Sequence, residues 1–395
     1  MEPEPKLELD FKNTEIAFSH KSDKELKKMA RLFRLMNNPA LVKIGSALGL
    51  LAINLRLPFS KYFIKQTLFD QFVGGENLLD CQGAIDHLFR NNALTILDYG
   101  AEGKSTEEEL NHVMNETIRA IEFAAANTSV PVVSTKITGL VDNIILEKLG
   151  RKESLNEGEQ RQYEQLRERV DNMCSRASEL EVGLFVDAEE SWIQDPIDDL
   201  VDDMMALYNH DKAAVYNTYQ LYRKDKLQCL KDAHKKAKEG GYILGAKLVR
   251  GAYMDKERDR AEEYNYPSPI NETKAETDKM YNDGVRYCVE NYETIESCNA
   301  SHNTESNRLQ ANLIHELGIV KNHPHLNFCQ LYGMSDNLTF NLAEEGFNVA
   351  KYVPYGPVND VVPYLIRRAK ENSSVTGEMS RELGFIDAEI KRRGL

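Results

Sequence analysis

The most apolar stretch of the sequence is too short and too interrupted to cross a membrane. It covers Ile44–Leu57, contains Gly45, Ser46, Gly49 and Asn54, and has basic residues on both sides. A spanning helix needs roughly 20 predominantly apolar residues in a row, so no transmembrane helix is expected. The stretch is typical of a core helix; a helix lying on a membrane surface is the alternative.

Closely spaced cysteines and targeting signals are also missing. The six cysteines are scattered and never form a C-x-x-C pair. This favours free thiols in a reducing compartment over a disulfide framework or a zinc site. The acidic start, Met-Glu-Pro-Glu-Pro, lacks the basic region of a signal peptide and the Arg/Ser bias of a transit peptide.

Positive charge is in deficit, with a formal net charge of −14 at pH 7. We therefore expect no nucleic-acid partner, since phosphates would repel such a chain.

No predicted strand is followed by the motif G-x-G-x-x-G, which disfavours a nicotinamide-binding Rossmann domain. A hydrophobic content of 42% and a charged content of 28% are ordinary for a soluble globular protein, and 395 residues allow one large domain or two smaller ones.

The first part of the chain, residues 1–91, has a helical pattern. Residues 1 to about 20 resemble a loosely held arm. Helices are predicted over Ser22–Asn54, Phe59–Phe72 and Asn77–Asn91 from apolar residues recurring at intervals of three and four. We expect these helices to pack on a larger domain that covers residues 92–395.

From Asn92 onward, short apolar runs alternate with longer charged helical stretches. Eight such alternations predict a parallel sheet and, by number, a closed (β/α)₈ barrel. The expected strands are Leu94–Tyr99, Val130–Lys136, Val182–Asp187, Ala214–Thr218, Ile243–Val249, Ile295–Ser301, Leu326–Tyr332 and Asn348–Tyr352.

Each of these strands ends in ionisable or hydrogen-bonding residues. In a barrel of this kind the carboxyl ends of the strands form the active site. Polar groups gathered there need partners, so they serve one another or a polar ligand. The residues are Asp98, Lys136, Asp187, Gln220, Lys247, Arg250, Ser301, His302, Asn303, Gln330 and Tyr352.

The ligand predicted from these residues is anionic. Lys136, Lys247 and Arg250 are basic residues at strand ends in an otherwise acidic chain. Gly251 and Ala252 are small enough for the backbone to approach a ligand closely. His302 has no second ligand at metal spacing, so no metal is expected. No Ser-His-Asp or Cys-His arrangement is recognisable.

A helix after the last strand carries two adjacent arginines. The apolar run Phe347–Val353 is expected to end at Pro354, and Asn359 or Asp360 to cap the helix that follows. In that helix Tyr364, Arg367 and Arg368 share a face, with Glu371 nearby. The guanidiniums are shaped to bind a carboxylate, although a solvated charged face is the alternative on spacing alone.

The chain resembles the proline dehydrogenase family, flavin-dependent enzymes that oxidise L-proline to Δ1-pyrroline-5-carboxylate. The resemblance runs from about Asn92 to the C-terminus and is less clear in the N-terminal helices. It rests on motifs in the family's order: Thr135-Lys136, Val186-Asp187-Ala188-Glu189-Glu190, Tyr219-Gln220, Lys247-Leu248-Val249-Arg250-Gly251-Ala252-Tyr253, Ser301-His302-Asn303, Gln330-Leu331-Tyr332-Gly333-Met334 and Tyr364-x-x-Arg367-Arg368. The chain is too short for the aldehyde-dehydrogenase domain of bifunctional members, so a monofunctional enzyme is expected.

The resemblance implies a distorted (β/α)₈ barrel that binds FAD, with a C-terminal helix over the barrel mouth. It implies hydride transfer from L-proline to the flavin N5. It implies catalytic roles for Lys136, Asp187, Tyr352, Arg367 and Arg368. It also implies that Leu248, Tyr364 and Glu371 complete the substrate pocket. Contacts to FAD fall to Asp187, Gln220, Lys247, Arg250, Gly251, Ala252, Tyr253, Ser301, His302, Asn303 and Gln330. Lys247 departs from members that have Arg there.

The resemblance also implies a quinone or other electron acceptor. The expected location is cytoplasmic, with a peripheral contact at the inner face of the membrane, or mitochondrial in a processed eukaryotic chain. Tyr352 would disfavour a 4-substituent, so proline is expected over hydroxyproline. Two alternatives stay open: a Schiff-base aldolase that uses Lys136 or Lys247, and a mostly helical interaction scaffold.

Overall fold

A computed structural model describes residues 7, 9–38, 40–42, 45, 64–100, 104–374 and 378–395, with only the backbone at 369–374, 378 and 379. It divides into two compact units. Unit 1 contains residues 1–100 and 330–395, and unit 2 contains residues 101–329. Most of the apolar stretch 44–57 lies outside the described residues.

The predicted fold class is confirmed, because eight parallel strands follow one another in the order of a closed barrel. The helical-scaffold alternative is therefore wrong. The strands are β1 (Leu94–Tyr99), β2 (Val132–Thr135), β3 (Gly183–Val186), β4 (Val215–Gln220), β5 (Leu244–Val249), β6 (Ile295–Ala300), β7 (Leu326–Leu331) and β8 (Val349–Tyr355).

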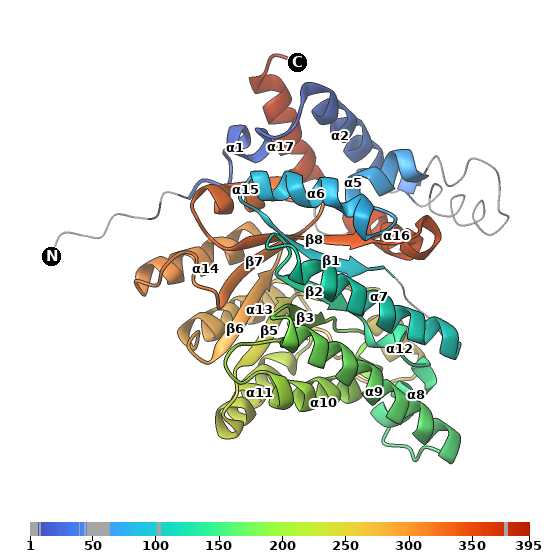
Figure 1. Ribbon diagram of the computed structural model, residues 1–395. Helices are drawn as coiled ribbons and strands as arrows, with labels where there is room; N and C mark the ends of the chain where they lie inside the picture. The colour runs from blue at the N-terminus through green and yellow to red at the C-terminus, as the bar shows by residue number, and fades with distance from the viewer. Residues whose placement is uncertain are drawn as a thin grey trace. The chain divides into compact units, whose positions relative to one another are not determined.

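Helices follow the strands, as a (β/α)₈ barrel requires (Figure 1). Within the described residues, those of unit 2 are α7 (Glu107–Ala125), α8 (Asn143–Gly150), α9 (Glu157–Glu179), α10 (Ser191–Tyr208), α11 (Lys226–Gly240), α12 (Met254–Glu263), α13 (Lys274–Glu290) and α14 (Thr304–Glu316). Those of unit 1 are α1 (Thr14–Phe18), α2 (Asp23–Met36), α5 (Asp70–Phe72), α6 (Leu78–Arg90), α15 (Asp336–Glu344), α16 (Val358–Ser374) and α17 (Glu378–Arg392), with a π-helix at Lys65–Phe69.

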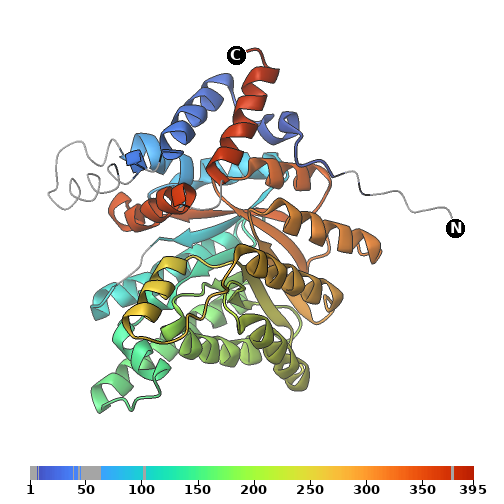
Figure 2. The same ribbon diagram turned by 180° about the vertical axis from the view of Figure 1, so that it is seen from behind.

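Unit 2 forms β2 to β6 and most of β7, and its helices lie on the outer side of these strands. Helix α11 packs on β4 and β5, and α13 packs on β5 and β6, as seen from behind in Figure 2. Capping boxes at Thr106, Asn156 and Thr273 begin α7, α9 and α13, each with a glutamate three residues into the helix. Such reciprocal bonds satisfy backbone N–H groups that a helix start leaves unpaired.

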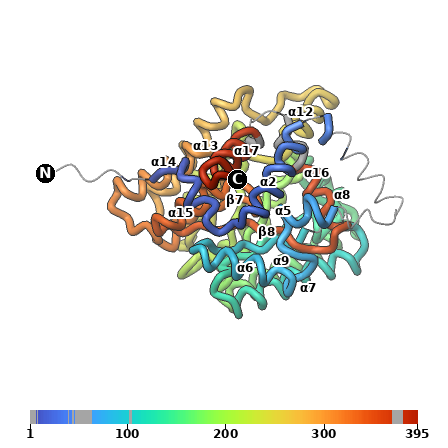
Figure 3. Tube along the Cα trace, turned by 90° about the horizontal axis from the view of Figure 1, so that it is seen from above, coloured from blue at the N-terminus to red at the C-terminus, as the bar shows by residue number. Residues whose placement is uncertain are grey.

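Unit 1 combines the β1–β8 strand pair with a helical core. β1 and β8 pair in parallel, from Leu94 opposite Ala350 to Tyr99 opposite Tyr355. Helices α2 and α17 lie side by side in Figures 1 and 3. Phe18, Phe33 and Phe72 are buried in the apolar cluster that these helices share with α16. The apolar face of α2 thus has a partner close to the other end of the sequence.

Three details of the sequence interpretation of unit 1 are wrong. Residues 11–20 are no loose arm, since Phe11 and Phe18 are each only 1% exposed and Thr14–Phe18 form α1. β8 does not end before Pro354 but runs on to Tyr355. Pro354 lacks an N–H, yet its carbonyl accepts a bond from the backbone of Gly74 at 2.8 Å, so it still joins the backbone network. Helix α16 begins at Val358, which places Asn359 and Asp360 inside its first turn.

Among the helices that are described, none combines the length and apolarity that crossing a bilayer requires. The described residues also contain no group of three or more His, Cys, Asp or Glu side chains arranged to hold a metal ion.

Candidate active site

An ionic cluster lies in unit 2, at the carboxyl ends of β2 and β3 and within β5. Asp187 follows β3 and accepts bonds from Lys136 Nζ at 2.8 Å and from Lys247 Nζ at 2.6 Å. Ser134 Oγ donates to the same carboxylate at 3.0 Å. The three ionic side chains are mostly buried, with 13%, 7% and 14% of Lys136, Lys247 and Asp187 exposed.

The two lysines keep Asp187 ionised. Burial by itself would raise the pKa of Asp187, but the charges of Lys136 and Lys247 outweigh it and hold that pKa well below its ordinary value. Lys136, Lys247 and Asp187 together carry one net positive charge. A cluster of this sign at a strand-end site is suited to an anionic ligand.

Glu189 is a second buried carboxyl beside this cluster. Its oxygens accept bonds from the backbone N–H of Thr138 at 3.0 Å and from Thr138 Oγ at 2.5 Å. Its own backbone N–H donates to Gln194 Oε1, and its carbonyl accepts from Gln220 Nε2, both at 2.6 Å. Burial raises the pKa of Glu189 to about 7. The sequence motif contained Glu189, but no role was predicted for it.

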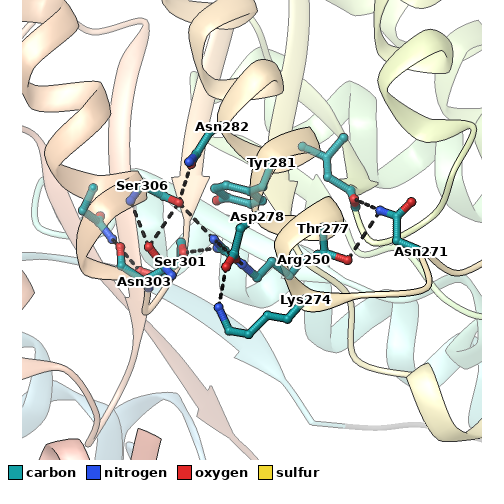
Figure 4. Close-up of polar contacts among 12 residues, drawn as sticks. Arg250, Asn271, Lys274, Thr277, Asp278, Tyr281, Asn282, Ser301, Asn303 and Ser306 are labelled. Carbon is teal, nitrogen blue, oxygen red and sulfur yellow. Dashed lines mark hydrogen bonds and ion pairs between the residues drawn. The ribbon is translucent and has the colours of Figure 1, made fainter. Parts of the chain in front are cut away.

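Arg250, predicted to contact a cofactor, is held by a polar cluster at the end of β5 (Figure 4). Its guanidinium donates to Asp278 at 2.9 Å, to Ser301 Oγ at 2.7 Å and to Ser306 Oγ at 3.0 Å. The guanidinium carbon also lies 4.3 Å from the centre of the Tyr281 ring. Asp278 and Tyr281 belong to α13, Ser301 follows β6 and Ser306 lies in α14, so two helices and a strand end together orient this arginine.

The predicted residues Ser301 and Asn303 lie next to Arg250 (Figure 4), and His302, between them in the sequence, is half-buried. Ser301 Oγ accepts the backbone N–H of Asn303 at 3.1 Å. The Asn303 side chain caps α14 by accepting the N–H of Ser306 at 3.0 Å. An arginine beside a helix N-terminus is a combination that suits phosphate groups.

The loop after β5 can approach a ligand closely. Gly251 has φ of +139°, and a Cβ there would lie 2.4 Å from the Tyr222 ring, so only glycine fits. Ala252 is exposed and Tyr253 half-buried. Leu248, in contrast, is 1% exposed, and its carbonyl accepts a bond from Tyr281 Oη at 3.0 Å.

The remaining predicted residues belong to unit 1. Tyr364 and Arg368 meet as the helical spacing predicted, with the guanidinium carbon 5.5 Å from the tyrosine ring centre. Arg367 and Arg368 are half-buried, which does not suit a fully solvated charged face. Tyr352, in β8, is 6% exposed. Gln330 accepts a bond from Thr339 Oγ at 2.8 Å. The side chain of Glu371 lies outside the described residues.

A family model described as proline dehydrogenase matches residues 81–381. The chain is 31% identical to the mitochondrial proline dehydrogenase 2 of Arabidopsis thaliana, over 99% of this chain and 92% of that one. It is 38% identical to the mitochondrial proline dehydrogenase 1 of Drosophila melanogaster, over 60% of this chain but only 36% of that one. It is also 30% identical to the hydroxyproline dehydrogenase of Xenopus laevis, over 95% of this chain and 88% of that one.

Among solved structures, proline utilization A from Bdellovibrio bacteriovorus superimposes with a TM-score of 0.72 at 22% identity. The match covers 93% of this chain and 40% of that protein. At this identity the likeness supports the barrel fold alone. The family model spans most of the sequence, and the chain belongs to the proline dehydrogenase family.

Proposed function

We propose that the protein is an FAD-dependent proline dehydrogenase that oxidises L-proline to Δ1-pyrroline-5-carboxylate. Family membership supports this reaction. The observation that carries the proposal is Asp187 bound between Lys136 and Lys247. This arrangement fixes two cations within one mostly buried site, where one can meet a substrate carboxylate and the other an electron-rich cofactor.

The residues of unit 2 fit a flavin dinucleotide. Arg250 lies beside the start of α14, and this combination suits a pyrophosphate group. Gly251, in the loop after β5, lets the backbone approach a dinucleotide closely. When bound, FAD supplies the hydride acceptor at N5. The residues proposed to hold it are Asp187, Gln220, Lys247, Arg250, Gly251, Ala252, Tyr253, Ser301, His302 and Asn303 of unit 2, and Gln330 of unit 1.

The substrate carboxylate is proposed to bind Lys136, Arg367 and Arg368. Three cations would fix the ring of proline in one orientation, which lowers the entropic part of the barrier. Cationic neighbours would also favour loss of the proton from the substrate ammonium. Leu248, Tyr352, Tyr364 and Glu371 are proposed to line the remainder of the pocket. Lys136 Nζ and Lys247 Nζ are both bonded to the Asp187 carboxylate. This disfavours the aldolase alternative, in which one of these amines would attack a carbonyl.

We further propose a quinone as the electron acceptor, reached through a peripheral contact with a membrane. The names of the Arabidopsis and Drosophila relatives include the word mitochondrial, which supports a mitochondrial location in a eukaryote. For a bacterium we propose a cytoplasmic location with a contact at the inner face of the cell membrane. The stretch Ile44–Leu57, suggested for this contact, falls almost wholly outside the described residues.

Replacement of the arginines tests the carboxylate assignment. Arg367→Met and Arg368→Met should each raise the KM for L-proline by about 30-fold or more, because loss of a buried charge-assisted pair costs about 2 kcal/mol or more. The flavin absorbance per mole of protein should stay unchanged. Arg34→Met is the matched control, since Arg34 is 54% exposed and bonds Asp387 at the surface of unit 1. Wild-type KM values in both Arg367 and Arg368 variants would refute the assignment.

A further inference from the structure

Glu189 is a buried carboxyl of the candidate site, and the proposed function assigns no role to it. It is 4% exposed. Asp187 is bonded to lysines and Glu190 to Lys256. In the described part of the chain, both bonds to the Glu189 carboxyl come from the uncharged Thr138 instead. A buried carboxylate with only neutral donors is costly to keep ionised.

The position of Glu189 ties it to the cation that is proposed to bind substrate. Thr138 lies two residues after Lys136, in the short 3₁₀ turn Ile137–Gly139. Bonds to Gln194 and Gln220 fix the backbone of Glu189 on both sides, so its carboxyl stays with that turn. Lys136 therefore has two acidic neighbours of different kinds: Asp187, which is bonded to it, and Glu189, which acts through its charge.

We propose that Glu189 exchanges a proton with solvent and thereby sets the affinity of the Lys136 cluster for an anionic substrate. With Glu189 ionised, its charge offsets that of Lys136 and weakens the attraction for a carboxylate. When a carboxylate binds beside Lys136, Glu189 takes up one proton from solvent: a lone pair of its carboxylate forms the new O–H bond as an O–H bond of hydronium or buffer acid breaks, and nothing is oxidised or reduced. Glu189 is a positioning residue, acting through Lys136. The proposal rests on the proposed function, since it assumes a carboxylate at Lys136.

The remaining charges around Glu189 leave it as the group that titrates near neutrality. Asp187 is held ionised by Lys136 and Lys247, as shown above. Burial raises the pKa of Glu189 to about 7, against the opposing effects of the Thr138 bonds and the Lys136 charge, while Glu190 raises it further. Glu190 itself is bonded to Lys256 of α12.

The first experiment observes the Glu189 proton directly and needs neither substrate nor flavin. Infrared spectra of the wild type should show the C=O stretch of a protonated carboxyl at about pH 6 that is lost by about pH 8, as a carboxyl with a raised pKa requires. Glu189→Gln should lack this band, and the neighbouring Glu190→Gln should keep it. A wild-type spectrum that Glu189→Gln does not change would overturn the proposal.

The second experiment measures the coupling to binding. Calorimetric titration with cyclopentanecarboxylate, which has no amine to titrate, should give a Kd that rises about tenfold between pH 6 and 8, as expected for one added charge at an effective dielectric constant of about 20. In Glu189→Gln the Kd should change less than about twofold, and in Glu190→Gln the full change should persist. A merely structural role would alter the stability of Glu189→Gln but not this pH dependence.

Thr138→Val provides a second variant in case Glu189→Gln fails to fold. It removes a bond that favours the ionised carboxyl, so the transitions in both experiments should move to higher pH. A wild-type Kd that is equal at the two pH values overturns the coupling alone. No binding at either pH overturns the carboxylate site of the proposed function, and the coupling with it.

Discussion

Asp187→Asn tests the electrostatic core of the site. The substitution keeps the size of the side chain but removes the negative charge between Lys136 and Lys247, whose side chains are 13% and 7% exposed. An uncompensated buried charge costs about 3–5 kcal/mol. We expect the free energy of unfolding of the protein to fall by about that amount.

The assay is urea unfolding followed by tryptophan fluorescence. The chain has one tryptophan, Trp192, which lies in unit 2 five residues after Asp187 and contacts Arg260, with 4.3 Å from the guanidinium carbon to its ring. With an m-value of about 2–3 kcal/mol/M, the midpoint should move down by about 1–2.5 M.

Asp203→Asn is the matched control. Asp203 bonds Arg167 at 3.0 Å, but the two side chains are 53% and 42% exposed, so its loss should cost less than about 1 kcal/mol. The pH dependence gives a further check. The pKa of Asp187 is depressed, so its contribution is present above its ordinary value of 3.8 and is lost as pH falls below it. If Asp187→Asn costs no more than the control at neutral pH, the account of the cluster is wrong.

Two further predictions concern the ligands. Gly251→Ala should reduce the flavin content of the purified protein, because the new Cβ would overlap the Tyr222 ring and φ of +139° disfavours alanine. Gly318→Ala is the control, since its φ of +65° is also positive but nothing lies within 4 Å of the new Cβ; equal flavin content in both variants would contradict the prediction. The kcat/KM for L-proline should exceed that for 4-hydroxyproline if Tyr352 packs against the ring; equal or better efficiency with hydroxyproline would instead match the name of the Xenopus relative.

The parts of the fold that the sequence predicted are those that local patterns determine. β1 was predicted at its observed bounds, Leu94–Tyr99, since an apolar run of strand length lies between polar segments there. The contact between Tyr364 and Arg368 follows from helical spacing. Pro354 shows the limit of such patterns: proline usually ends a strand, yet β8 continues through it, and its carbonyl accepts a hydrogen bond from the Gly74 N–H.

The parts of the site that were missed depend on pairs far apart in the sequence. Thr138 and Glu189 are 51 residues apart, and Arg250 and Asp278 are 28 apart. Residue type alone could not show that Glu189 is buried with neutral partners while Glu190, its neighbour, is paired with Lys256. The buried phenylalanine of α1 was missed for the same reason, because its partners come from other helices of unit 1.

The visible spectrum of the purified protein, recorded before and after anaerobic addition of L-proline, tests the central claim most directly. The account predicts a yellow protein whose oxidised-flavin bands bleach with proline, and an Arg368→Met variant of equal flavin content that bleaches much less at the same proline concentration. A colourless protein that retains no added FAD, or a flavin that stays oxidised under saturating proline, would contradict it.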